Sequence, residues 1–179
     1  MSRLTKVISG GQTGVDQAAL RAARAAGLEI GGWCPPGREC ETGVIPAELP
    51  LKETERERSP GAPAVPRSQR SEWNVRDSDG VLVIQATVTS RGSETVRESA
   101  DHAAKEEANS GTDWAMRCAK RFGRPLLVCD VSDPEAKEKI RQWLDRFSII
   151  VLSVGGRAES TCPGIGERAY RLLCAVFEL

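Results

Sequence analysis

Short, continuous apolar runs alternate along this chain with longer segments in which apolar residues recur every three or four positions. The run at 81–84, Val-Leu-Val-Ile, is of the first kind and predicts a buried strand. Over 115–122 the apolar residues fall at i, i+3, i+4 and i+7, which is one face of a helix. The same criteria predict strands at 6–9, 30–34, 126–129 and 149–152, helices at 14–26, 136–147 and 165–176, and a helical turn at 71–77.

Strands that are apolar throughout, alternating with helices, are typical of a parallel sheet covered on both faces. We therefore expect an α/β protein, a Rossmann-like, doubly wound three-layer sandwich with a mainly parallel sheet. The length of 179 residues favours a single domain over 1–179. Two stretches interrupt the alternation: 52–70 is charged and proline-rich and predicts a polar surface loop, and 86–110 predicts a polar insertion.

The charge balance argues against a dedicated nucleic-acid binder. Lys plus Arg and Asp plus Glu each number 25, so the formal net charge is zero, whereas such binders usually carry a basic surplus. No apolar run approaches the roughly 20 residues that span a bilayer, and the N-terminal residues lack a signal-peptide core. We therefore expect a cytoplasmic protein with no nucleic-acid and no membrane partner.

The metal-ligating residues are few and scattered. There is one histidine, His102, and the six cysteines form no CxxC motif. Cys34 and Cys40 could offer a thiolate from a Gly/Pro-rich loop, although reduced thiols that pack in the core are the simpler interpretation. The sequence leaves the identity of any metal ligand unknown.

In a doubly wound fold, ligands bind at the carboxyl ends of the strands. The first candidate loop is Gly10-Gly11-Gln12-Thr13-Gly14, between a strand and a helix. Its glycines let the backbone approach a phosphate at the helix N-terminus. The alternative is a tight turn needed only for packing, with Asp16 as a helix-start residue.

Further polar loops are expected at the same edge of the sheet. Arg38, on a rigid turn, could hold an anion while Trp33 stacks on a flat ring, or the tryptophan is simply buried and the arginine solvated. Between 72 and 79, Arg76 either contacts a ligand or pairs with a neighbouring aspartate. The helix start at Ser110-Gly111-Thr112 and the turn before Ser160 complete the candidates, with plain helix capping as the alternative.

These loops carry a family resemblance. ISGGQTGVDQAAL (8–20), GGWCPPGR (31–38), EWNVRDSDGVLVI (72–84) and GGRAES (155–160) are similar, in order, to the molybdenum carrier family of molybdenum cofactor carrier proteins. The resemblance implies a Rossmann-like homo-oligomer, a tetramer or dimer, that holds molybdopterin with its terminal phosphate without turnover and passes it to a molybdoenzyme. The binding residues that it implies, with the rest of the first loop, are Gly10, Gly11, Gln12, Thr13, Gly14, Arg38, Asn74, Arg76, Asp77, Gly111, Thr112 and Ser160.

The fold also resembles the lysine-decarboxylase-like phosphoribohydrolases, which cleave nucleoside monophosphates. Those proteins carry PGGxGTxxE, with the glutamate taking part in catalysis. Here the stretch 109–115 lacks the first glycines and has Ala115 where the glutamate would stand, with Asp113 as a conceivable substitute. A phosphoribohydrolase, or a nucleotide-binding sensor without chemistry, is therefore the alternative to the cofactor carrier.

Overall fold

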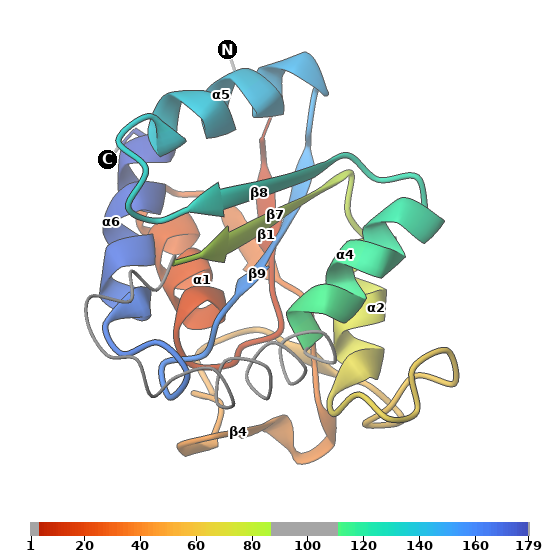
Figure 1. Ribbon diagram of the computed structural model, residues 1–179. Helices are drawn as coiled ribbons and strands as arrows, with labels where there is room; N and C mark the ends of the chain where they lie inside the picture. The colour runs from red at the N-terminus through yellow and green to blue at the C-terminus, as the bar shows by residue number, and fades with distance from the viewer. Residues whose placement is uncertain (1–3, 87–110, 179) are drawn as a thin grey trace, which may run out of the picture.

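A five-stranded parallel sheet forms the centre of the protein (Figure 1). The computed structural model describes residues 4–86 and 111–178. Each neighbouring pair of strands in this sheet is parallel, which confirms the predicted fold class. From one edge to the other the strands are β2 (Glu29–Gly31), β1 (Lys6–Ile8), β9 (Val151–Gly156), β7 (Gly80–Gln85) and β8 (Leu126–Asp130).

Helices cover both faces of the sheet and make the fold a three-layer sandwich (Figure 1). Strand β7 shows why its sequence is apolar throughout: Leu82 and Ile84 belong to the core on one face, and Val81 and Val83 to the core on the other. The first core lies under α1 (Val15–Ala25), α5 (Ala136–Arg146) and α6 (Ile165–Val176), and the second under α2 (Ser68–Arg76) and α4 (Gly111–Arg121).

A small lobe with its own core interrupts the alternation after β2. Strand β3 (Trp33–Cys34) pairs in parallel with β6 (Lys52–Glu53), and β4 (Glu39–Cys40) pairs antiparallel with β5 (Gly43–Val44). A short 3₁₀ helix (Pro36–Arg38) precedes β4. The buried residues of the lobe, which pack with Leu20 of α1, are Cys34, Cys40, Ile45, Leu49 and Leu51.

The predicted strand at 30–34 is divided in the structure because the backbone turns at Gly32. This residue has φ 124°, and a Cβ on it would lie 2.4 Å from the carbonyl oxygen of Ser9. The strand predicted at 149–152 begins two residues later and continues to Gly156.

The segment 52–70 differs from the predicted surface loop in two ways. Its first residues form β6, and its last three are the first turn of α2, which replaces the helical turn predicted at 71–77. Between these elements Ala62 and Val65 are buried in the core under α2 and α4. Of the predicted insertion at 86–110, only Ala86 is described; the remainder lies outside the described residues.

Within residues 4–86 and 111–178, no helix is both long enough and apolar enough to cross a membrane.

Candidate functional site

The loop between β1 and α1 lies at the carboxyl edge of the sheet, as predicted, but its glycines serve packing. Gly14, at φ 79°, would place a Cβ 2.5 Å from the carbonyl oxygen of Arg157. A Cβ on Gly11, at φ 74°, would point into the small lobe, 2.5 Å from Leu51. A side chain on either glycine would point into protein and not into solvent. Both residues therefore support the interpretation of this loop as a tight turn needed for packing.

Asp16 places its carboxylate inside this loop. Oδ2 accepts hydrogen bonds from the backbone N–H of Gln12 at 3.3 Å and from Nη1 of Arg70 at 2.7 Å. The side chain of Asp16 is 5% exposed. Burial raises the pKa of Asp16 above its ordinary value, and the charge of Arg70 offsets part of that rise. An internal carboxylate thus occupies the position at which a phosphate was predicted.

Arg70, in the first turn of α2, is the partner of Asp16 and the centre of the site. A Cβ on Gly10 would lie 1.9 Å from Nη1 of Arg70, so the absence of a side chain at Gly10 makes room for the guanidinium. The Arg70 side chain is 16% exposed. Its buried Nε has no hydrogen-bond partner among residues 4–86 and 111–178, and such a donor is costly to leave unpaired.

The N-terminus of α4 lies beside this arginine. A Cβ on Gly111 would lie 3.7 Å from Nη2 of Arg70 and 3.4 Å from Oγ of Ser71. Thr112 donates a hydrogen bond through Oγ1 to the carbonyl oxygen of Gly156, at 3.3 Å, which ties the helix to the end of β9. The positive end of the α4 dipole and the Arg70 guanidinium therefore meet at one corner of the carboxyl edge.

Glu41 joins the small lobe to this edge. The hydroxyls of Thr13 and Ser160 both donate hydrogen bonds to its carboxylate, and the backbone N–H of Ser160 adds a third at 3.1 Å. Burial acts to raise the pKa of Glu41, but these hydrogen bonds outweigh it and hold the pKa below its ordinary value. Gln12 adds a hydrogen bond from Nε2 to the carbonyl oxygen of Glu39 at 2.9 Å. Gln12, Thr13 and Ser160 thus fix the lobe against the glycine loop.

Arg38 has a structural role. Its guanidinium donates to the carbonyl oxygens of Leu51, Pro46 and Leu49 at 3.0, 3.0 and 2.9 Å. Arginine is suited to this task because its N–H donors are fixed in a planar fork. These hydrogen bonds hold the long loop of the small lobe in place.

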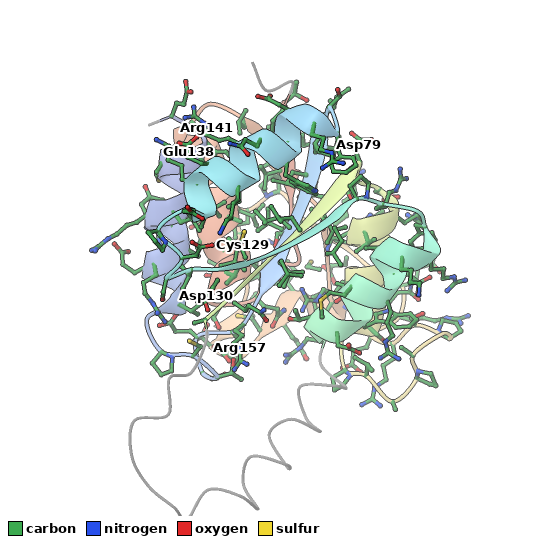
Figure 2. All side chains as sticks on the ribbon, turned by 45° about the horizontal axis from the view of Figure 1, so that its top comes forward. Asp79, Cys129, Asp130, Glu138, Arg141 and Arg157 are labelled. Carbon is green, nitrogen blue, oxygen red and sulfur yellow. The ribbon has the colours of Figure 1, made fainter. Side chains whose placement is uncertain are left out.

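The predicted cluster at 72–79 comprises the second half of α2 and the turn into β7, and it runs toward the opposite, amino edge of the sheet. Asn74 still lies near the carboxyl end of β1, because a Cβ on Gly32 would meet both Ser9 and Oδ1 of Asn74. Asp79 accepts a hydrogen bond through Oδ2 from the N–H of Val151 at the start of β9, at 2.8 Å. Figure 2 shows Asp79 at one end of the sheet and Asp130 and Arg157 at the other. The expectation that this segment lies at the carboxyl edge is therefore wrong for its last residues, because they lead into a strand and do not follow one.

The polar groups of this cluster have protein partners. Asn74 accepts from the N–H of Trp33 at 2.8 Å and donates to its carbonyl oxygen at 2.9 Å. Arg76 pairs with Asp77 at 2.6 Å, and Asp77 also accepts from Nε1 of Trp33 at 2.7 Å. The hydrogen bond from Arg76 is the main reason that the pKa of Asp77 is lowered. The contacts therefore support the alternative in which Arg76 pairs with a neighbouring aspartate.

The residues that could ligate a metal are dispersed. Cys34 and Cys40 are both buried in the small lobe, and burial raises the pKa of the Cys34 thiol. Within the described ranges, no group of three or more His, Cys, Asp and Glu side chains could hold a metal ion.

The ion pair of Arg70 and Asp16 is not evident from the sequence. Arg70 stands in the proline-rich stretch that predicts a loop, and the pattern around Asp16 predicts only a helix-start residue. One signal was present: a buried acid in a glycine turn needs a cationic partner. The sequence did not indicate which of 25 basic residues supplies it.

Comparison with known proteins agrees with this architecture. The family model of the circularly permutated YpsA SLOG family matches residues 7–108 and 103–177. The crystal structure of a protein from Syntrophus aciditrophicus SB, named putative molybdenum carrier protein, is similar with a TM-score of 0.78 and 30% sequence identity. The match covers 99% of this chain and 97% of that chain. A search of the curated proteins gives no match. The family match extends over nearly the whole sequence, and the chain belongs to the circularly permutated YpsA SLOG family.

Proposed function

We propose that this protein binds and protects the molybdenum cofactor, a molybdopterin with a terminal phosphate, for storage or transfer and without turnover. The observation that carries the proposal is Arg70, a nearly buried guanidinium with one internal carboxylate partner and an Nε without a hydrogen-bond partner in the described part of the chain. A second anion at this corner would engage the remaining donors of the guanidinium.

The phosphate end of the cofactor is assigned to the corner between Arg70 and α4. Gly111 and Thr112 supply the N-terminus of the helix, and Ser71 supplies a hydroxyl next to it. Gly10 contributes by leaving space for Arg70. The proposal assigns no protein ligand to the metal.

The structural neighbour supports a molybdenum-related ligand, and the choice of the molybdenum cofactor rests on the family resemblance of the sequence. That neighbour is named putative molybdenum carrier protein, and the similarity extends over nearly the full length of both chains. A carrier of this kind would work as a homo-oligomer, a tetramer or dimer, in the cytoplasm, and would pass its ligand to a molybdoenzyme.

Two glycine variants test the proposed site without removing a charge. In Gly10→Ala the new methyl group collides with the end of the Arg70 side chain and displaces it. In Gly155→Ala the nearest atom to the new Cβ is Oδ1 of Asp16, at an ordinary 3.8 Å. Binding of purified molybdenum cofactor is measured anaerobically by calorimetry or fluorescence.

We expect Gly10→Ala to weaken binding by at least about tenfold, since a charge-assisted hydrogen bond contributes about 1.5–3 kcal/mol. Gly155→Ala should bind within about twofold of wild type. No binding by the wild-type protein would refute the proposed function. Equal binding by both variants would refute the assignment to Arg70.

AMP and molybdate, run beside the cofactor, separate the carrier from a nucleotide sensor. A ligand at 100 times its dissociation constant adds about 2.7 kcal/mol to the free energy of unfolding. Stabilisation by AMP that exceeds stabilisation by the cofactor would favour the sensor and count against the carrier.

A nucleoside-monophosphate phosphoribohydrolase is the second candidate, and Asp16 is the observation that favours it. This buried acid in a glycine loop has a raised pKa, as acid–base residues often do. Asp113, the acid considered from the sequence, instead pairs with Arg117 one turn along α4, at 2.9 Å. Release of adenine from AMP that is abolished by Asp16→Asn and retained in Asp113→Ala would establish this activity.

A further inference from the structure

Strand β8 is an edge strand of the central sheet. In the part of the chain that the structure describes, its hydrogen-bonded neighbour is β7 and it has none on the other side. Figure 1 shows β8 running along the front of the sheet, with α5 and α4 on either side of its path. An edge strand presents a row of backbone N–H and C=O groups that can pair with another strand.

The hydrogen bonds to β7 show which residues of β8 face outward. The carbonyl oxygen of Pro125 accepts from Val81 at 2.9 Å, and the N–H of Val131 donates to Gln85 at 2.7 Å. Odd-numbered residues of this stretch therefore direct their backbone groups at β7, because alternate residues of a strand point to opposite neighbours. The outward-facing residues are the even-numbered ones: Arg124, Leu126, Val128 and Asp130.

The same residues expose apolar side chains. Leu126 and Val128 are 37% and 39% exposed, whereas the intervening Leu127 packs against the core under α5. An edge with two exposed apolar side chains and no lysine on the strand lacks the usual protection against pairing, apart from Pro125 at its start.

The charges on this edge are arranged to complement a second copy. When two copies of β8 run antiparallel with Leu127 opposite itself, Arg124 stands opposite the partner's Asp130 and Leu126 opposite the partner's Val128. Each of these pairs joins two outward-facing residues, as a hydrogen-bonded antiparallel pair requires. The Arg124 side chain donates a hydrogen bond from Nη2 to the carbonyl oxygen of Arg76 at 2.9 Å, and its buried Nε has no partner among residues 4–86 and 111–178.

We propose that two copies of this protein pair through β8 about a twofold axis at Leu127, which joins the two sheets into one. The interface is isologous, so the charged pair and the apolar pair each occur twice. Moving the twofold axis by one residue in either direction slips the register by two residues and places Arg124 opposite Val128 or Ser132, which loses the charge pairing. The axis is therefore placed at Leu127. The proposal is independent of the ligand.

Sedimentation of the full chain at micromolar concentrations tests the interface. We expect the wild-type protein to be at least dimeric. Val128→Lys, which puts a charge in the apolar centre, should dissociate the β8 pairing at concentrations at which the wild type is associated. Val44→Lys is the matched control, because Val44 is 68% exposed on β5, away from β8, and this variant should leave association unchanged.

A charge exchange tests the register. Arg124→Glu and Asp130→Arg each place like charges opposite one another at two sites, and each should weaken pairing about tenfold. The double variant restores opposite charges and should return the dissociation constant to within about threefold of wild type. Circular dichroism and thermal unfolding verify that each variant is folded.

A monomeric wild-type protein, or full association of folded Val128→Lys, would overturn the proposal of a β8 interface. Dissociation by Val128→Lys without rescue in the double charge variant would overturn the register. If Arg124→Glu does not fold, because Arg124 also binds α2, Asp130→Arg and Val128→Lys still decide the question.

Discussion

The two polar clusters at opposite edges of the sheet differ in whether their charges are satisfied within the protein. At the amino edge, Arg76 and Asp77 pair with each other, and Asp77 also accepts a hydrogen bond from Trp33. At the carboxyl edge, Arg70 pairs with Asp16 and still has an unpaired buried N–H in the described structure. A dense run of polar residues therefore does not by itself indicate a ligand site. The unpaired Nε of Arg70 is what distinguishes the carboxyl-edge cluster from the other.

The largest expected effect is the loss of the buried pair. Arg70→Ala leaves the Asp16 carboxylate buried without its cation, and we expect the free energy of unfolding to fall by about 3–5 kcal/mol. The measurement is urea denaturation at neutral pH. Arg70→Met combined with Asp16→Asn should recover most of this loss, since no uncompensated charge is then buried. A loss of less than about 1 kcal/mol in Arg70→Ala would contradict the importance of the pair.

A pair of alanine variants measures how tightly the glycine loop is packed. Gly11 and Gly27 have nearly equal φ, 74° and 75°, but a Cβ on Gly11 would meet Leu51 at 2.5 Å and one on Gly27 would meet nothing within 4 Å. Both substitutions cost about 1 kcal/mol for the backbone, and Gly11→Ala should cost about 1–3 kcal/mol more for the collision. Equal losses in thermal or urea unfolding would show that the small lobe moves aside freely.

Asp16 and Glu41 should contribute to the free energy of unfolding with opposite dependences on pH. The pKa of Asp16 is raised in the folded state, so its contribution falls as pH rises from the ordinary pKa of an aspartate through the raised one. The pKa of Glu41 is lowered, so its contribution is present above the ordinary pKa of a glutamate and is lost as pH falls through the lowered one.

Urea denaturation of the wild type, Asp16→Asn and Glu41→Gln across this acidic range measures the two contributions. Relative to the wild type, Asp16→Asn should gain stability as pH rises, and Glu41→Gln should gain stability as pH falls. The same slope for both variants would contradict the assigned causes.

The smallest effect is expected at the amino edge. The side chains of Arg76 and Asp77 are 43% and 38% exposed, and exposed ion pairs contribute less than about 1 kcal/mol. Arg76→Ala should therefore change neither stability nor cofactor affinity by more than that amount. A loss of cofactor binding in this variant would reverse the comparison and place the ligand at the amino edge.

The central sheet and the helices around α1, α5 and α6 could be predicted because their pattern of apolar residues is regular. The run 81–84 is apolar because both of its faces are covered, and α1 is rich in alanine because it packs closely on its neighbours. Helix α2 could not be predicted over its full length. It buries Ser68, Gln69, Ser71 and Asn74, and such polar positions give no apolar periodicity.

The site was predicted where it depends on chain order and missed where it depends on tertiary contact. The first loop and the start of α4 lie near one another because parallel strands bring their carboxyl ends to one edge. Arg70 reaches that edge from the start of a helix that precedes its strand, 54 positions from Asp16. Spacing along the sequence cannot indicate such a pair.

The position of Asp16 also bears on how tightly the proposed ligand would be held at this edge. Its carboxylate is tethered to the same chain and already occupies Nη1 of Arg70, and a tethered group acts at an effective concentration that a free monovalent ion rarely reaches. A weak anion such as chloride therefore gains little at Arg70, while a ligand with several points of attachment can use the remaining donors. Such a ligand shares the guanidinium with Asp16, so it is held less tightly than it would be by an unpaired arginine. Weaker retention of this kind suits the proposed transfer of the ligand to another protein.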